Sequence, residues 1–220
     1  RSLYFTGGSN EDGEFLWMKD YLQLDGMSYK LVPIKTSMRN RTMFEMGRID
    51  SEKMYNNLQK LEWRNINSGN IYLDEQTKRN SISLRNNMLR LAETYINEAN
   101  FDKATEILEL SLNKMPIRQF EHYSIPLAYP ELYYRLGNKE KAREIAEQLI
   151  AIFKQQLTWY STFDASYNNI IIDQIENTLL MYKRGVLDII EANDPDKAYN
   201  KKMQDDFMNT MQLFEHLMPE

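Results

Sequence analysis

The chain has 220 residues, of which 42% are hydrophobic and 27% are charged, a composition typical of a globular protein. Its 27 basic and 32 acidic residues give a net charge of −5, which argues against a nucleic-acid surface because such a surface needs clustered Lys and Arg. The absence of cysteine excludes disulfides, thiolate zinc sites and cysteine nucleophiles. No apolar run reaches the roughly 18 residues that span a bilayer, so we expect no direct membrane insertion by this stretch of chain.

Residues 1–49 are predicted to form a small strand–helix–strand segment followed by a linker. The run SLYF, residues 2–5, and the run MSYKLVPI, residues 27–34, are typical of short strands. Between them, apolar residues recur at helical spacing over residues 15–24, and Gly26 follows as a stop signal. We expect the two strands to pair side by side, and because two strands alone are marginally stable, they must pack on something larger.

From residue 50 onward the pattern becomes helical, and residues 50–220 are assigned to a helical repeat domain. Asp50 or Ser51 is predicted to cap a first helix. A loop follows, and Asp74 then caps a long helix that runs to about residue 99.

Three further helices are predicted in the middle of the chain. Asp102 caps a helix that the proline at position 116 ends, and a connector over residues 117–125 follows. A short helix over residues 127–136 stops at a glycine, and Asn138 then caps a helix that continues to about residue 160.

The last third of the sequence predicts two long helices. The first spans residues 165–192. Asp194 is expected to cap the second, with Pro195 at its first position, where the missing N–H costs nothing.

The middle helices match the tetratricopeptide (TPR) pattern, a helix–turn–helix repeat of about 34 residues. With Ala104 as the small residue of the second helix, signature positions of the first helix fall on Met88, Leu91, Ala92 and Tyr95. With Ala142 in the same role, a second and more degenerate repeat is obtained. Because small residues let paired helices approach closely, we predict a mainly α fold, a TPR-like α-α superhelix of stacked helix pairs with a small N-terminal α+β segment. The alternative is an irregular helical bundle whose alanines match by chance.

Four stretches carry a family resemblance: RSLYF, DYLQLDGMSYKLVPIKT, NIYLDEQTKR and the repeat helices after them. In this order they resemble the C-terminal region of a Bacteroidetes family of multi-spanning membrane proteins, which is itself similar to protein O-mannosyltransferases that use lipid-linked sugars. A serine stands at position 2, where members usually have proline. The resemblance implies that this chain is a piece of a membrane-anchored parent. It also implies a location on the periplasmic side of the inner membrane, tethered through the parent's transmembrane helices.

No catalytic residue of that family falls on this chain, because the resemblance places the transferase residues in the membrane part. The sequence itself offers no nucleophile motif, no phosphate-cradling glycine loop and no paired metal ligands; its two histidines, His122 and His216, are far apart. We therefore assign no catalytic, cofactor-binding or metal-binding residue and no cofactor, and expect this chain not to be an enzyme. For the parent, the resemblance implies a lipid-linked-sugar-dependent glycosyltransferase, and the sequence of this chain does not decide that activity.

Polar side chains lie off the apolar stripe of the helix that begins near residue 75. Stacked helix pairs form a concave surface lined by such helices, and arginines suit recognition of an extended peptide or an acidic terminus. We predict a partner-binding role for Arg85, Asn86, Arg90 and Asn97. The expected partner is a protein or peptide segment, such as the membrane part of its own parent; the alternative is a merely solvated face.

The stretch TWYSTFDASY gathers four aromatic residues, Trp159, Tyr160, Phe163 and Tyr167. They are candidates for a ligand platform, which would make the chain a glycan- or lipid-linked-sugar-binding module. The favoured alternative is a packed corner between two long helices. The main functional prediction is thus a non-catalytic periplasmic interaction or accessory domain of a glycosyltransferase-like membrane protein, with the glycan-binding module as its rival.

Overall fold

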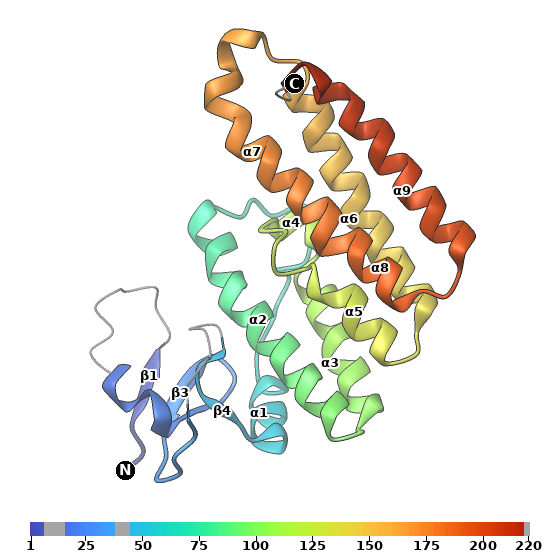
Figure 1. Cartoon of the computed structure of the whole chain (residues 1–220). Helices are drawn as coiled ribbons and strands as arrows, with labels where there is room; N and C mark the ends of the chain where they lie inside the picture. The colour runs from blue at the N-terminus through green and yellow to red at the C-terminus, as the bar shows by residue number, and fades with distance from the viewer. Residues whose placement is uncertain (7–15, 38–44, 218–220) are drawn as a thin grey trace. The chain divides into compact units, whose positions relative to one another are not determined.

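The computed structural model describes residues 1–6, 16–37 and 45–217, and the chain divides into two compact units, Arg1–Ile125 and Pro126–Glu220. Most of the described residues are helical, and a small sheet lies near the N-terminus (Figure 1). A mainly α fold with a small N-terminal α+β segment is therefore confirmed. The sheet and the first helices share one unit, and a domain boundary between residues 49 and 50 stays a prediction.

The N-terminal sheet has four strands in the order β1-β3-β2-β4. Their bounds are Tyr4–Thr6 for β1, Leu22–Leu24 for β2, Ser28–Leu31 for β3 and Arg48–Ile49 for β4. The predicted pairing of the first strand with the strand in residues 27–34 is confirmed, since Phe5 of β1 lies opposite Tyr29 of β3 in an antiparallel ladder. β2 also pairs antiparallel with β3, whereas β4 joins β2 in parallel.

The helix predicted over residues 15–24 is only partly present. Phe15 lies outside the described residues, and the 3-10 helix η1 occupies Leu16–Tyr21. The last part of the prediction is wrong, because Leu22 and Leu24 belong to β2 and are fully buried. Pairing on both sides of β2 outweighs the helical spacing of its leucines.

The described residues of the first unit also form α-helices after the sheet. They are α1 (Ser51–Leu58), α2 (Glu75–Asn97), α3 (Phe101–Lys114) and α4 (Ile117–Phe120). Of the two predicted candidates for the cap of α1, Asp50 and Ser51, the cap is Asp50, whose carboxylate accepts from the Lys53 N–H. The predicted cap Asp74 is confirmed, since its carboxylate accepts from the Thr77 N–H.

Two local predictions in the first unit are wrong. Asn100, not Asp102, caps α3, because the Asn100 side chain accepts from the Lys103 N–H and places Asp102 inside the first turn. The connector predicted over residues 117–125 contains the short helix α4, whose two end residues, Ile117 and Phe120, are buried.

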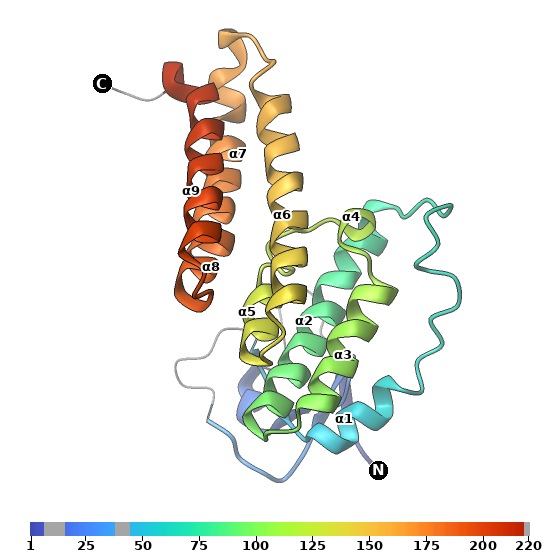
Figure 2. The ribbon, with the colours of Figure 1, turned by 90° about the vertical axis from the view of Figure 1, so that its right-hand side faces the viewer.

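The hydrophobic core of the first unit is centred on the α2–α3 hairpin, whose helices lie side by side (Figures 1 and 2). On α2, all the predicted signature positions are fully buried: Met88, Leu91, Ala92 and Tyr95. On α3, Ala104 and Leu108 are equally buried. The repeat pattern thus identified the face along which these two helices pack.

The second unit is entirely helical over its described residues. Its α-helices are α5 (Ala128–Arg135), α6 (Lys139–Tyr160), α7 (Asn168–Leu180), α8 (Asp188–Asn193) and α9 (Lys197–Met211). A 3-10 helix η3 (Ala165–Tyr167) precedes α7, a π-helical turn η4 (Met181–Leu187) joins α7 to α8, and a 3-10 helix η5 (Gln212–Leu217) follows α9. None of the helices among residues 1–6, 16–37 and 45–217 has the length and apolarity needed to cross a membrane.

The predicted corner between α5 and α6 is confirmed. Gly137 ends α5 with a φ of +75°, a left-handed conformation that glycine adopts without strain. The side chain of Asn138 then accepts from the Lys141 N–H and caps α6, which runs to Tyr160 as expected.

The rod formed by α7, η4 and α8 contains a feature that the sequence pattern did not predict. The N–H of Asp188 donates to the carbonyl of Lys183, five residues earlier, which marks the wider π turn. Gly185 in this turn faces Leu127, and a Cβ atom at that position would lie only 2.6 Å from Leu127 Cδ1. The glycine therefore permits a close approach of the rod to the start of α5.

The start of α9 corrects one predicted cap. Asp196 accepts from the N–H groups of Ala198 and Tyr199, so it is the cap, and Pro195 precedes the helix. Asp194 does not cap because its carboxylate is held by Arg143.

Candidate functional site

Arg85, the first of the predicted partner-binding residues, is not on a solvated face. It is only 2% exposed, and its Nη2 donates to the carbonyl of Met115 at 2.6 Å. Met115 is the C-cap residue directly after α3, at the end of the helix where carbonyl groups lack partners within the helix. Arg85 thus closes the end of α3 from within the core, and the expectation that it faces solvent is wrong.

Arg90 is half-buried and binds backbone of its own chain. Its guanidinium donates to three consecutive carbonyls, those of Glu45 at 3.1 Å, Met46 at 2.8 Å and Gly47 at 2.8 Å. Gly47 has a φ of +81°, and a Cβ there would lie 3.0 Å from the Tyr29 ring. The fork of Arg90 therefore fixes a glycine-dependent bend that leads into β4.

The other polar residues of α2 divide between structural and surface positions. Asn87, which the sequence did not single out, is buried and donates from Nδ2 to the carbonyl of Gly26 at 2.8 Å. Asn86 is half-buried and Asn97 is exposed, and a partner-binding role for these two stays a prediction. α2 thus uses Asn87 and Arg90 to hold the sheet segment of its own chain.

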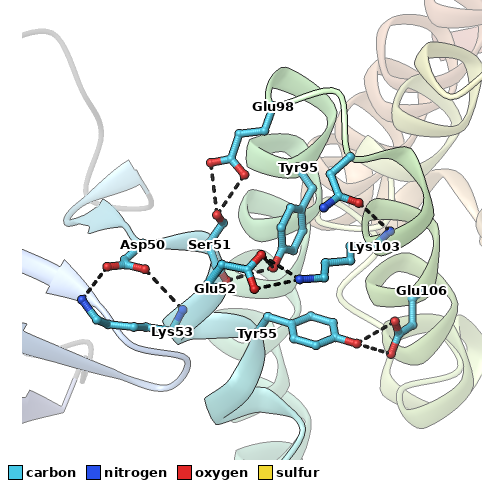
Figure 3. Close-up of polar contacts among 10 residues, drawn as sticks. Asp50, Ser51, Glu52, Lys53, Tyr55, Tyr95, Glu98, Lys103 and Glu106 are labelled. Atoms are coloured by element: carbon cyan, nitrogen blue, oxygen red, sulfur yellow. Dashed lines mark hydrogen bonds and ion pairs between the residues drawn. The ribbon is translucent and has the colours of Figure 1, made fainter.

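A polar network joins α1 to α2 and α3 (Figure 3). Lys103 of α3 donates from Nζ to both carboxylate oxygens of Glu52, at 2.7 and 2.8 Å. Its ammonium lies 4.8 Å from the centroid of the Tyr55 ring and 5.5 Å from that of the Tyr95 ring, distances at which cation–π attraction operates. One cation therefore connects side chains from all three helices.

Two tyrosine hydroxyls complete the network (Figure 3). Tyr95 donates to the carbonyl of Ser51 at 3.1 Å, and Tyr55 donates to the two oxygens of Glu106 at 2.8 and 2.7 Å. Burial raises the pKa of Tyr95 well above its ordinary value, and the hydrogen bond to Glu106 raises that of Tyr55. Both hydroxyls therefore remain protonated donors at neutral pH.

The N-terminal segment exposes large apolar side chains although its inner face is buried. The exposed large apolar residues among the described part of positions 1–37 are Leu3, Tyr4, Trp17, Tyr21, Met27 and Ile34. Trp17 in η1 has the largest exposed fraction of these residues, 80%. Tryptophan and tyrosine are enriched at protein interfaces, so Trp17, Tyr4 and Tyr21 are candidates for contact with a partner.

The aromatic residues near Trp159 do come together, where α6 ends and the chain turns into α7. The Trp159 ring lies 5.2 Å from Tyr160 and 4.8 Å from Phe163, and Phe163 lies 5.8 Å from Tyr167, measured between ring centroids. Tyr160 and Phe163 are half-buried, as a packed corner requires, but Trp159 is 58% exposed and Tyr167 48% exposed. The corner is therefore packed on its inner side and open on its outer side.

A shallow groove of about 700 Å³ also lies between α6 and α9. The ion pair of Lys154 and Asp206 spans it, and its apolar floor includes Ile150 and Met203. Both of those apolar side chains are already buried by their neighbours. Among the residues that the structure describes, no three His, Asp or Glu side chains gather as a metal site would require.

The comparison with known proteins bears on the N-terminal segment. Residues 1–53 match the family model described as TMEM260-associated domain 2. The match links this segment to a family of membrane proteins, and it is compatible with the resemblance to O-mannosyltransferase-like proteins. No curated protein and no solved structure matches the chain significantly.

The matched range includes the positions at which α2 and α3 bind the N-terminal part of the chain: Gly26, Glu45–Gly47, Ser51 and Glu52. The matched residues comprise the four strands and the first residues of α1, including Ser51 and Glu52. The matched segment thus ends where the polar network of Figure 3 begins.

Proposed function

We infer that this chain is a non-catalytic accessory region of a membrane protein that resembles lipid-linked-sugar glycosyltransferases. In this proposal it lies on the periplasmic side of the inner membrane, tethered through its parent's transmembrane helices. Its N-terminal segment contacts the membrane part of the same parent. The observation that carries the proposal is the match of residues 1–53 to a domain associated with a membrane protein.

The exposed apolar side chains of the matched segment support a contact with protein. Tryptophan and tyrosine are enriched at protein interfaces, where partners bury them. Trp17 and Tyr4 are exposed here, and they belong to the residues that the family model covers.

The attachment of the segment to α2 and α3 supports its role as a presented surface. Arg90 and Asn87 bind backbone carbonyls on two different bends of the segment, at Glu45–Gly47 and at Gly26. Lys103 and Tyr95 bind Glu52 and Ser51 at its end. Because surfaces held by rigid elements lose little conformational entropy on binding, this arrangement suits docking.

The TPR-like interpretation belongs to the same proposal. In the pair α2–α3 and in the pair α5–α6, the small residue expected at the helix crossing, Ala104 or Ala142, is fully buried. The second pair also buries Tyr129 and Tyr133 of α5 completely. These positions support two repeats, the second of them degenerate, in a domain built for contacts between proteins.

Photo-cross-linking in the full-length parent tests the docking surface. A photoreactive phenylalanine derivative at position 17 is expected to form cross-links with peptides from the membrane part of the same polypeptide. The matched control is position 72, since Tyr72 is 89% exposed but lies outside the matched segment. Equal cross-linking from both positions, or none from position 17, would contradict the proposed docking.

A separate assay tests the absence of catalysis in this chain. The purified 220-residue chain is expected to produce no turnover with polyprenyl-phosphate sugars or aryl glycosides. Turnover that disappears on one carboxylate substitution, such as Asp206→Ala, would show that this region carries catalytic groups of its own.

A further inference from the structure

The outer surface where α6 meets α7 has a composition that identifies a class of ligand. We call the set Trp159, Tyr160, Phe163 and Tyr167 the aromatic end of the second unit. It spans the connection that leads from the last turn of α6 through η3 to the start of α7 (Figure 1). It is remote in sequence from the N-terminal segment, and the inference drawn from it is independent of the proposed docking.

Trp159 and Tyr167 each contact a neighbouring ring and remain about half exposed. The Phe163 ring meets the Trp159 ring edge-on, with an interplanar angle of 85° at 4.8 Å, and Tyr160 contacts the same indole at 5.2 Å. Phe163 also contacts Tyr167, which is half exposed. The indole of Trp159 is thus held in place by ring contacts while more than half of the residue remains accessible.

The rim of the aromatic end carries oxygen acceptors. Thr162 donates its hydroxyl proton to the carbonyl of Trp159 at 2.7 Å, and Ser161 donates to that of Thr158 at 2.8 Å. With their protons engaged, these hydroxyl oxygens keep lone pairs that can accept a hydrogen bond. Asp164 is exposed beside them and adds a carboxylate. A ligand that brings its own donors would complement this rim.

The same stretch of chain lacks cations. No Lys or Arg occurs between Lys154 and Lys183 in the sequence. Single-stranded nucleic acid also stacks on aromatic rings, but it requires a basic groove. Membrane surfaces attract polybasic segments, and a carboxylate such as Asp164 opposes an anionic bilayer. The absence of Lys and Arg and the presence of Asp164 therefore disfavour binding of single-stranded nucleic acid and of an anionic bilayer.

We propose that the aromatic end binds a neutral pyranose ring of a carbohydrate. The apolar C–H face of the sugar stacks on the electron-rich face of Trp159, with Tyr167 beside it. Its hydroxyl groups donate to Asp164 and to the hydroxyl oxygens of Ser161 and Thr162. The ligand class follows from one chemical match, since a neutral sugar combines an apolar face with a ring of hydrogen-bond donors.

Intrinsic fluorescence tests the proposal directly. Trp17→Phe and Trp63→Phe leave Trp159 as the single tryptophan of the chain. Titration with maltohexaose, mannohexaose, xylohexaose and chitohexaose is expected to give a saturable change for at least one of them, with a Kd of about 1 mM or tighter. Trp159→Ala, measured by calorimetry in the otherwise natural chain, is expected to weaken that binding by about tenfold or more, and Asp164→Asn to weaken it by a smaller factor.

Two controls separate sugar binding from general adhesion. Trp17→Ala removes an exposed tryptophan elsewhere and is expected to leave sugar binding unchanged. Vesicles of phosphatidylglycerol and phosphatidylethanolamine are expected not to bind through Trp159. Absence of saturable binding to all four hexasaccharides would overturn the proposal, as would vesicle binding that Trp159→Ala abolishes.

Discussion

Arg143 of α6 holds Asp194 through two hydrogen bonds, from Nε to Oδ2 at 2.6 Å and from Nη2 to Oδ1 at 2.8 Å. The Asp194 side chain has no exposed surface, and the hydroxyl of Tyr134 donates to the same carboxylate at 2.9 Å. The guanidinium also lies 3.9 Å from the centroid of the Tyr199 ring. The Asp194 carboxylate and the guanidinium bound to it therefore connect α5, α6 and α9.

Replacing Asp194 with alanine is expected to lower the free energy of unfolding by about 2–4 kcal/mol. The substitution leaves Arg143 and the Tyr134 hydroxyl without their shared acceptor in a largely buried setting. Urea denaturation followed by circular dichroism measures the change. Asp205→Ala is the control, because Asp205 is exposed on α9 and is expected to change stability by less than about 0.5 kcal/mol.

The same carboxylate predicts a pH dependence of stability. Hydrogen bonds from Arg143 hold the pKa of Asp194 well below its ordinary value of 3.8. A lowered pKa in the folded state gives stabilisation that is present above the ordinary value and is lost as the pH falls through the folded value. The stability difference between the natural chain and Asp194→Asn is therefore expected to shrink below about pH 4. A difference that stays constant from about pH 7 to about pH 3 would exclude this linkage.

Asp194 also shows what local sequence signals can and cannot predict. Asp50, Asp74 and Asn138 were identified as caps because a cap needs only its own next three residues. Asp194 carries the same local signal, an aspartate directly before a proline and a helical pattern, but its partner Arg143 is 51 residues away. A short-range pattern contains no information on that contact, so the cap was assigned two residues too early.

For the candidate site residues too, burial could be predicted from short-range patterns, whereas long-range contacts could not. Ala104 and Met88 were correctly placed in the core because the helical period determines which face is buried. Arg85 and Arg90 were expected on an open face because arginines off the apolar stripe usually are. Their carbonyl partners lie on Met115, directly after α3, and on the bend at Glu45–Gly47, and neither position could be inferred from the periodicity of α2.

Adding a methyl group at Gly185 is expected to destabilise the second unit. The new Cβ would lie 2.6 and 2.8 Å from the two methyl carbons of Leu127, well inside contact distance. We expect Gly185→Ala to cost about 1–3 kcal/mol despite the better helix propensity of alanine, measured by chemical denaturation. Gly69→Ala is the matched control, since nothing lies within 4 Å of its added Cβ.

The cause of the Gly185 effect can be verified with a second substitution. Leu127→Ala removes the side chain that the new methyl group would meet. The cost of Gly185→Ala is expected to fall by about half or more in this background, because the two sites are in contact. Equal costs in both backgrounds would assign the effect to something other than this clash.

Removing the Arg90 fork is expected to loosen the bend before β4 without unfolding the first unit. Arg90→Ala deletes three hydrogen bonds to carbonyls at Glu45–Gly47. Amide exchange of Arg48 and Ile49 is expected to accelerate by about tenfold or more, since local opening becomes easier. Arg90→Lys should be nearly as damaging, because an ammonium cannot reproduce the planar fork. Exchange mass spectrometry on both variants measures the effect.

The ion pair of Glu52 and Lys103 is expected to contribute far less than that of Arg143 and Asp194. The Glu52 side chain is 61% exposed and that of Lys103 30% exposed, so solvent screens their attraction. A double-mutant cycle with Glu52→Gln and Lys103→Met is expected to give a coupling of about 0.2–1 kcal/mol that declines with added salt. A coupling near 3 kcal/mol would mean that Lys103 acts through its ring contacts as a single unit with the carboxylate.

The π turn at Met181–Leu187 makes the rod between the aromatic end and Asp194 tolerant of a change in length at one place. The turn accommodates one residue more than an α-helical turn, so a relative lacking one residue within it would continue as ordinary α-helix, with Ile190 and Asp194 on nearly the same faces. A one-residue deletion in the regular α-helix on either side would instead rotate everything beyond it by about 100° and separate Asp194 from Arg143. Single-residue differences in the length of this rod should therefore fall within Met181–Leu187.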